Sequence, residues 1–396
     1  MLAWVAGGLY ALVCTISVSE LATTLPQEGG WYVYARRAFG GYGGFLAGYS
    51  DLLVQIVALA YVSTAAGEFV VALLPGIPIG GKTVTILMLS IFGILHYLGI
   101  RIGGGAQKVN TIVVGLGLIG FVIACFVLGH RDAVASQSPA LVAPTGLPLL
   151  VAFVIAFQSV IITYDGWYCA IYFMEENQDP TRTLPRSAIG GVVGTIAIYL
   201  LVNLALLYVL PVSQMARSTF PAGDAAQIIF GKTGQQMVLL ISLLTVIGIA
   251  NSIFLIAPRI VYVLGRDGWF SRHASDVNRG GTPVAGLLLA VVCSSALVLT
   301  RSFDRLLAIQ AVLIVVLYLT GFVSLFVLRK REPNLARPFK AWGYPWTPLA
   351  ALLGSLAYFI LNLASDFKNG LLGLAFLAMS YPIFLLAKRF RREAVA

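Results

Sequence analysis

The chain has 396 residues, of which 59% are hydrophobic and only 11% are charged, and its mean hydropathy is +0.90. Because a water-soluble domain carries about 25% charged residues, this composition excludes a soluble globular protein. The net charge is +10, but the basic residues gather in loops on one side of the expected membrane spans. The basic charge therefore reports membrane topology and indicates no nucleic-acid partner.

Apolar segments recur along the chain at the length that a membrane helix needs, which is about 20 residues. They are long and continuous, whereas the strands of a membrane barrel are segments of about 10 residues with alternating hydrophobicity. We therefore expect an all-α polytopic helical bundle in a lipid bilayer. The eleven expected spans are residues 2–24, 43–73, 83–100, 109–129, 147–173, 188–211, 236–264, 282–300, 304–328, 346–365 and 369–387.

The distribution of lysine and arginine predicts the orientation of these spans. If the loop that holds Arg36 and Arg37 is cytoplasmic and the sides alternate, most of the 26 basic residues face the cytoplasm. We therefore expect a multi-pass protein of the cytoplasmic membrane with a cytoplasmic C-terminus. Eleven spans then place Met1 outside, although no basic residue precedes Arg36. We expect one further helix upstream of Met1, with an N-terminus that is truly outside as the alternative.

Two segments share the pattern Phe-Gly-x-x-Gly directly before a long span, namely Ala38–Gly43 and Ile229–Gly234. The orientation above places them on opposite sides of the membrane. Inverted repeats are typical of secondary transporters, whose substrate sites lie near the bilayer midplane at the repeat interface. We expect a single transmembrane domain over residues 1–396, and chance similarity is the alternative to a repeat. Its parts are an incomplete first repeat at 1–129, a second repeat at 147–328 and two additional helices at 346–387.

The most informative segment is Ile161–Trp167, which places Asp165 and Gly166 inside an otherwise apolar span. A charge at membrane depth is costly and usually faces a cavity. A helix interrupted here would leave free carbonyl and amide groups, which suit the ammonium and carboxylate of a zwitterion. Alternatively, Asp165 caps the second half-helix by accepting from the amides of Trp167 or Tyr168. The two interpretations are compatible.

Other polar residues inside the spans have two interpretations each. Glu20 could join an inner gate with basic loop residues, or be an exposed charge at a helix end. We expect Asp51 and Glu68, in the second span, to make hydrogen bonds within the bundle, with a gating or coupling role as the alternative for Asp51. Asn251 either faces the transport pathway or makes a hydrogen bond between helices. His96 is expected to be a buried, hydrogen-bonded histidine.

Four motifs occur in the order found in one transporter superfamily. They resemble the second helix and following loop, the sixth helix and its loop, and the loop between the eighth and ninth helices of the amino acid–polyamine–organocation transporters. This resemblance implies the leucine-transporter fold and amino acids or related amines as substrates. The motifs are Ser19–Ala22 with Pro26–Tyr34, Tyr164–Trp167 with Glu175–Arg186, Arg266–Trp269, and Gly281–Val284.

The same resemblance implies a substrate site. In that superfamily the unwound stretch of the sixth helix binds the amino group of the substrate through backbone carbonyls. Some members carry a lysine in the fifth helix that is associated with proton coupling, but the matching region near Gly115–Gly117 has none. A coupling proton or a sodium ion therefore both remain open. Ile162 takes the place of an aromatic lid, which implies a smaller gate. The implied substrate-binding residues are Ile162, Thr163, Tyr164, Asp165 and Gly166.

We expect secondary active transport of an amino acid or related amine by alternating access. One alternative is a transport-inactive fragment, because the glycine-rich break of the superfamily's first helix has no counterpart here. A polytopic membrane enzyme is a further alternative, but an enzyme would need clustered His, Asp or Glu at one membrane face. The three histidines and four cysteines are dispersed along the chain, so we expect no enzyme activity, no cofactor and no metal site.

Overall fold

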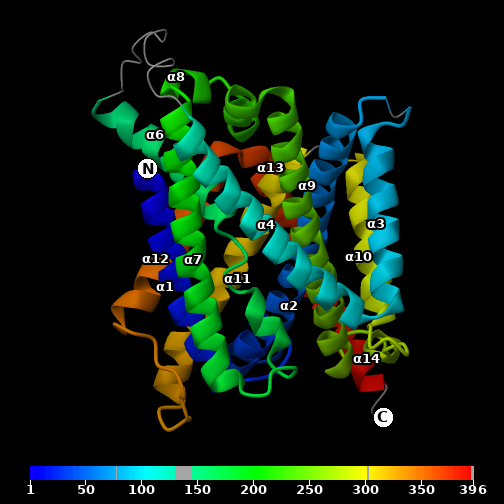
Figure 1. The fold of residues 1–396 in the computed structure, drawn as a ribbon. Helices are drawn as coiled ribbons and strands as arrows, with labels where there is room; N and C mark the ends of the chain where they lie inside the picture. Colours follow the sequence, from blue (N-terminus) through cyan, green and yellow to red (C-terminus); the bar gives the residue numbers. More distant parts are fainter. Residues whose placement is uncertain (77, 130–144, 301–302, 394–396) are drawn as a thin grey trace.

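The computed structural model describes residues 1–76, 78–129, 145–300 and 303–393, and over these residues the chain is the expected all-α bundle (Figure 1). The helices are α1 (Leu2–Thr24), α2 (Trp31–Leu73), α3 (Gly81–Leu98), α4 (Ile100–Leu128), α6 (Leu147–Thr163), the 3₁₀ helix η1 (Cys169–Phe173), α7 (Pro180–Val209), α8 (Val212–Met215), α9 (Pro221–Arg266), the 3₁₀ helix η2 (Arg272–Ser275), α10 (Val284–Thr300), α11 (Phe303–Arg331), α12 (Trp346–Ser365), α13 (Phe367–Ala378) and α14 (Ser380–Glu393).

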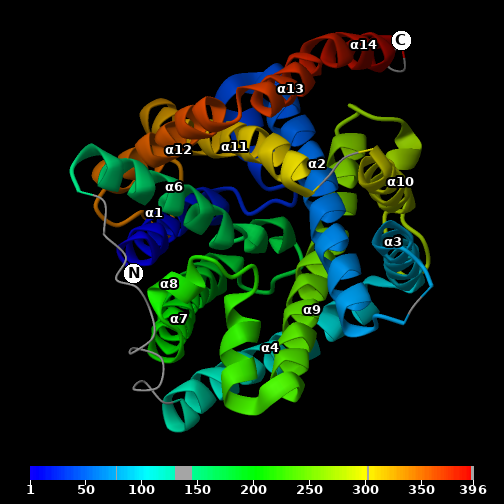
Figure 2. The ribbon, with the colours of Figure 1, turned by 90° about the horizontal axis from the view of Figure 1, so that it is seen from above.

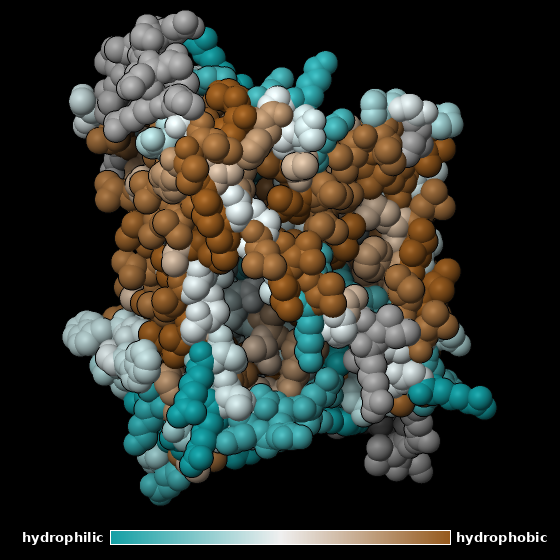
Figure 3. Space-filling view, in the orientation of Figure 1, coloured by the Kyte–Doolittle hydropathy of each residue, from teal (hydrophilic) through white to brown (hydrophobic). Residues whose placement is uncertain are grey.

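Nine helical stretches within the described residues are long and apolar enough to cross a membrane. The expected spans at 147–173 and 282–300 are represented by the shorter apolar helices Val151–Thr163 and Val284–Thr300. Side chains on the outside of the bundle form a broad hydrophobic belt, with hydrophilic residues concentrated at the lower end (Figure 3). The protein is therefore a multi-pass membrane protein.

The long helix α2 lies at the centre of the bundle and packs along both α9 and α11 (Figure 2). On one side, α1 packs against α6, α7 and α12, and on the other, α3 packs against α10. The α2 side chains that face these neighbours are buried, among them Phe45, Leu59 and the polar Asp51. Both faces of α2 are therefore covered by protein, which lets it carry polar groups at membrane depth.

The two Phe-Gly-x-x-Gly segments have the same backbone geometry. Each segment lies where a short connector helix joins a long helix at a bend, and the bend is at the first glycine of the pattern. Gly40 has φ 80° and ψ −162°, and Gly231 has φ 66° and ψ −157°. The connector of α2 lies at the lower end of the bundle, and the connector of α9 lies at the upper end (Figure 1).

Two expected spans are not single helices. The span at 147–173 ends its α-helix at Thr163 and resumes as η1 at Cys169, and the span at 369–387 is divided into α13 and α14 at Met379. Four other helices begin well before their expected bounds. Connectors extend α2 back to Trp31 and α9 back to Pro221, a proline in the first turn starts α7 at Pro180, and α4 begins at Ile100. Proline suits a first turn because its missing N–H would have no helical partner.

We predict that Gly40→Ala and Gly231→Ala each destabilise the fold by about 1–3 kcal/mol, because this backbone region is nearly exclusive to glycine. No atom lies within 4 Å of a Cβ added at either position, so the effect reports backbone strain alone. Thermal unfolding in detergent measures it. Gly190→Ala in α7, which also has open space around its Cβ, is the control and should not lower the unfolding temperature.

Candidate functional site

The interruption between α6 and η1 consists of turns between Thr163 and Cys169. The amide of Asp165 donates to the carbonyl of Ile162 at 3.1 Å, and the amide of Cys169 donates to that of Gly166 at 3.0 Å. Gly166 has φ +102°, a conformation that favours glycine because it has no Cβ. The helix therefore ends inside the bundle, at residues that line internal hollows.

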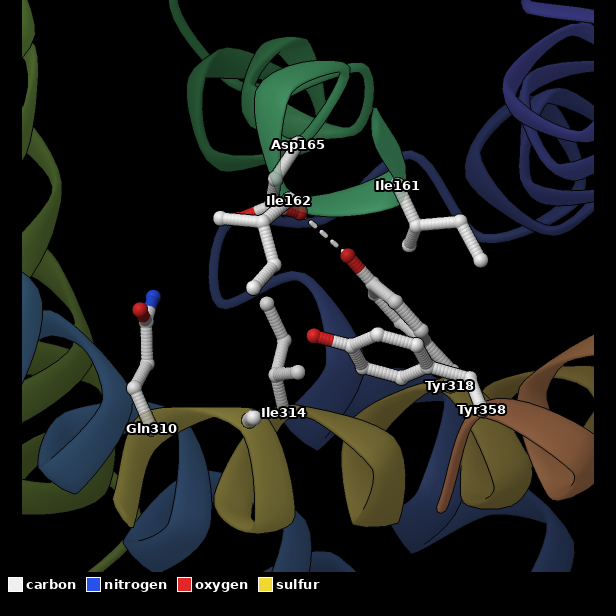
Figure 4. A pocket seen from close by; sticks show the side chains of 8 residues that line it. Ile161, Ile162, Asp165, Gln310, Ile314, Tyr318 and Tyr358 are labelled. Carbon is white, nitrogen blue, oxygen red and sulfur yellow. Dashed lines mark hydrogen bonds between the residues drawn. The ribbon is translucent and has the colours of Figure 1, made fainter. Parts of the chain in front are cut away.

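The carboxylate of Asp165 is directed at α11, where it accepts a hydrogen bond from the hydroxyl of Tyr318 (Figure 4). Ile162 and Ile314 lie beside this pair in the same small pocket. The expectation that Asp165 caps the second half-helix is wrong. The 3₁₀ helix η1 has Tyr168 at its N-cap and no side-chain cap hydrogen bond. The carboxylate instead accepts from Tyr318 on a distant helix and from the amide of Gly166, and not from Trp167 or Tyr168.

A central cavity of about 380 Å³ lies between α2, the interruption, α9 and α11. Among the expected substrate-binding residues, four line it, namely Ile162, Thr163, Asp165 and Gly166. Polar neutral groups from neighbouring helices line the same cavity, together with Tyr199 of α7. They are Gln55 and Tyr61 of α2, Thr245 and Ser252 of α9, and Gln310 of α11.

A second cavity of about 520 Å³ adjoins the first and opens toward the lower front face, between α7 and α9. Figure 3 shows this face hollowed below its middle. Thr163, Asp165 and Gly166 line both cavities. The interruption therefore stands between two connected hollows, one central and one that opens toward the lower half of the bundle.

Tyr164 is oriented differently from the other expected site residues. Its ring packs between Trp4 of α1 and Tyr199 of α7, with ring centroids 6.0 and 5.1 Å away. Its hydroxyl is buried, and no described residue forms a hydrogen bond with it. Tyr164 lines the lower cavity but not the central one.

An aromatic cluster lies below the interruption. Trp31, at the start of α2, lies 6.1 Å from Trp167, 5.5 Å from Tyr168 and 5.9 Å from Tyr318 between ring centroids. It approaches α11 so closely that a Cβ added at Gly321 would be 2.1 Å from its ring. This cluster fixes η1 against α2 and α11 and separates the central cavity from the lower end along this side.

A second group of contacts at the lower end is ionic and centres on Arg259 of α9. Its side chain is 4% exposed and pairs with Glu28 of the α1–α2 connection at 3.2 Å and with Glu176, which follows η1. Burial raises the pKa of Glu28 to about 7. The nearby carboxylates of Glu175 and Glu176 also raise this pKa, and the guanidinium groups of Arg259 and Arg266, which lower it, do not offset the rise. We call Glu28, Glu176 and Arg259 the ionic cluster.

Glu20 lies at the same end and is 2% exposed, so the interpretation as an exposed helix-end charge is wrong. Its carboxylate accepts from the guanidinium of Arg329 at 2.7 and 2.6 Å and from the amide of Ala341 at 2.7 Å. Arg337 lies 3.5 Å away. Glu20 thus ties α1 to the end of α11 and to the connection that leads into α12.

Asp51 and Asn251 also hold helices together. The carboxylate of Asp51 accepts from the hydroxyl of Tyr172 at 2.8 Å and from Gln55 at 3.2 Å, which links α2 to η1 as expected. Asn251 contacts His96 of α3 at 2.9 Å and donates to Gly103 and Gln107 of α4. Its geometry is that of a hydrogen bond between helices, and it does not line the central cavity.

Sequence reasoning missed three residues of the site. Tyr318 is one tyrosine in an apolar span, so nothing local marks it as the partner of Asp165. Arg259 lies inside the expected span at 236–264, and a basic residue within a membrane span is a usable signal of a buried ion pair. Trp31 was part of a recognised motif, but its packing role depends on helices that are distant in sequence. Among the described residues, no group of three or more His, Cys, Asp or Glu side chains could hold a metal ion.

A membrane helix that is interrupted beside an internal cavity is the arrangement that secondary transporters use for their substrate sites. Irregular backbone at this depth is tolerated only where protein or a water-filled cavity surrounds it. The fold and the site together therefore define the class of polytopic membrane transporters.

Comparison with known proteins is more specific. Residues 1–382 match the family model described as amino acid permease, and the chain belongs to this family. It is 24% identical to the serine/threonine exchanger SteT of Bacillus subtilis, covering 91% of this chain and 82% of the relative. It is also 24% identical to the human b(0,+)-type amino acid transporter 1 (86% and 70%) and to the mouse solute carrier family 7 member 12 (89% and 75%).

We predict that Glu20→Ala destabilises the protein by about 3–5 kcal/mol, because it leaves the guanidinium groups at a buried ion pair without their partner. Thermal unfolding in detergent measures the change. The matched control is Arg37→Ala, which removes a pair with Glu332 whose side chains are 53% and 27% exposed. An exposed pair contributes at most about 1 kcal/mol, so equal shifts for the two variants would contradict the assignment.

Proposed function

We propose that the protein carries a neutral amino acid across the cytoplasmic membrane by alternating access, with the substrate bound in the central cavity. The observation that carries this proposal is the interruption at Thr163–Tyr168, of which Thr163, Asp165, Gly166 and Tyr168 line that cavity. Each carbonyl oxygen has two lone pairs, so carbonyls that already accept one local hydrogen bond can also accept from a substrate ammonium. Ile162, Thr163, Asp165 and Gly166 supply these groups, and Tyr164 supports them from the side of α1.

The size and lining of the central cavity support a small neutral substrate. Its volume of about 380 Å³ lies within the range of about 300–1,000 Å³ that is typical of small-molecule sites. Among the described residues that line it, Asp165 is the only acidic or basic side chain, and Tyr318 already occupies its carboxylate. Amide and hydroxyl groups remain available to a polar side chain of the substrate. The named activity of SteT, serine/threonine exchange, agrees with this chemistry.

The domain organisation belongs to the same proposal. The matching bends at Gly40 and Gly231, at opposite ends of the bundle, support two inverted repeats, with the first at residues 1–129 and the second at 147–328. Residues 346–387 then form two additional spans, the second of which is divided into α13 and α14. The hydrophilic lower end would face the cytoplasm together with the C-terminus.

The ionic cluster and the aromatic cluster around Trp31 would form the inner gate of this transporter. Opening the lower end requires η1 and the α1–α2 connection to separate from α9, which breaks the pairs of Arg259 with Glu28 and Glu176. Glu20 would serve as an anchor for this gate. Asp51, a buried carboxylate whose described partners are neutral, is the candidate for binding a coupling proton, and Asn251 holds α9 in place. Sodium coupling is the alternative.

The membrane-enzyme and inactive-fragment alternatives have no support from the comparisons, since the family and the named relatives are transporters. The direct test uses the purified full chain in liposomes. We expect uptake of radiolabelled serine or threonine above that of empty vesicles. Uptake at the level of empty vesicles, across a panel of neutral amino acids and amines, would overturn the proposal.

We predict that Gly166→Ala lowers this uptake at least several-fold while the protein remains folded. The atom nearest to an added Cβ is the sulfur of Cys169 at 3.8 Å, so space is available and the change acts through the backbone. A residue with a Cβ resists φ +102° at a cost of about 1–3 kcal/mol, and the backbone groups that line the cavity would shift. Gly190→Ala, at a residue that lines neither cavity, is the control and should transport normally.

Cytoplasmic pH should regulate the inner gate through Glu28. In the closed gate its pKa is about 7, whereas a hydrated glutamate has a pKa of about 4.3. At pH values between these two pKa values, the closed state binds more protons than the open state. Low pH therefore favours closure, and rising pH favours opening. We predict that exchange speeds up as the internal pH of proteoliposomes rises from about 5.5 to about 7.5.

Glu28→Gln should abolish this dependence and hold the slow rate at both values, because glutamine has no charge to gain. Glu332→Gln is the matched control at the same end of the bundle. The hydrogen bond from Arg37 lowers the pKa of Glu332, so its titration lies below the tested range. A pH dependence that survives in Glu28→Gln would assign the regulation to another group.

A further inference from the structure

One charged residue that the proposed function leaves unused is Glu68, near the upper end of α2. The expectation of a hydrogen bond within the bundle is wrong for this residue, because its side chain is exposed and no described residue forms a hydrogen bond or ion pair with it. It lines a third cavity, of about 570 Å³, between the upper ends of α2, α3, α10 and α11. This cavity lies at the opposite end of the bundle from the ionic cluster.

The cavity carries opposite charges on two different helices. Glu68 of α2 supplies a carboxylate, and Lys82 in the first turn of α3 supplies an ammonium group. The two groups do not form an ion pair with each other. The described partner of Lys82 is the carbonyl of Leu299 at the end of α10, at 3.3 Å. The remaining lining is small or apolar and includes Val71 and Ala72.

The upper cavity adjoins the central one. Phe303, in the first turn of α11, lines both cavities. Tyr61 of α2 lines the central cavity and packs edge-on against Phe303, with ring centroids 5.7 Å apart. This aromatic pair therefore stands between the two hollows, and a solute in the upper cavity is separated from the central site by two rings.

We propose that the upper cavity is a second, outer binding site for the zwitterionic amino acid, which waits there before it passes the Tyr61–Phe303 pair. The inference rests on the proposed function and adds a site to it. The substrate ammonium pairs with Glu68, and the substrate carboxylate pairs with Lys82. A free amino acid carries both charges on groups bonded to the same α-carbon, so it can satisfy both groups at once, whereas a simple cation or anion satisfies one.

The outer site differs from the central one in its physical character. Both of its charged groups are exposed, so water and salt weaken their attraction for a ligand. The outer site should therefore bind less tightly than the central site and lose affinity as salt rises. The central site relies mainly on backbone and neutral polar groups within the bundle and should depend less on salt.

Equilibrium binding of radiolabelled serine to the detergent-purified full chain tests this proposal. The wild type should bind in two phases, the weaker of which is sensitive to salt. Glu68→Gln or Lys82→Gln should each remove the weaker phase and halve the amount bound at saturation. The exchanged pair Glu68→Lys with Lys82→Glu should restore it, because both charges of the zwitterion again have partners. Arg305→Gln, an exposed charge at the same end, is the control and should bind as the wild type does.

The possible results separate the two proposals. If the wild type binds neither serine nor any other neutral amino acid, the proposed function fails. If it binds serine but both single variants keep the full amount at saturation, the outer site is overturned while the central site stands. A phosphatidylethanolamine headgroup carries the same two charges, so binding is repeated in nanodiscs. Loss of the weaker phase in phosphatidylethanolamine discs, but not in phosphatidylglycerol discs, would assign the cavity to lipid and overturn the proposal.

Discussion

The structure depends on one constraint, which is that a backbone group inside a membrane needs a hydrogen-bond partner supplied by protein or enclosed water. The interruption after Thr163 breaks the helix that would satisfy these groups. It is stable because helices on every side cover it: Tyr199 donates to the carbonyl of Thr163, and Tyr318 donates to Asp165. The surrounding helices α2, α7, α9 and α11 are therefore both the walls of the cavity and the support of its backbone.

The two ends of the bundle are built differently. At the lower end, buried and partly buried ion pairs join segments that are far apart in sequence, and an aromatic cluster lies directly beneath the cavity. At the upper end, the Tyr61–Phe303 pair stands between two hollows, and the charged groups of the upper cavity, Glu68 and Lys82, are exposed. Breaking buried pairs costs more than parting two rings. This asymmetry means that the contacts holding the lower end together are stronger than those at the upper end, although the lower cavity still opens beside them between α7 and α9.

The ionic cluster also explains how charge is tolerated near a cavity that is otherwise neutral. Arg259 lies within a membrane helix and is almost fully buried, yet two carboxylates and the ring of Phe173 surround it. An uncompensated charge at this position would be strongly unfavourable. Its partners lie on the α1–α2 connection and after η1, which are the segments adjoining the interruption. Pairing and conformational change are therefore coupled in the same residues.

The sequence by itself determined the features that depend on local chemistry. Apolar length predicted the membrane helices, the shared Phe-Gly-x-x-Gly pattern predicted two related segments before long helices, and Asp165 with Gly166 predicted the interruption. Only the tertiary structure decided the partners. Tyr318 replaced the expected local cap of Asp165, Glu20 proved to be buried, and Glu68 proved to be exposed. The physical reason is that a backbone bend is fixed by the residues next to it, whereas a buried charge is satisfied by whichever helix packs beside it.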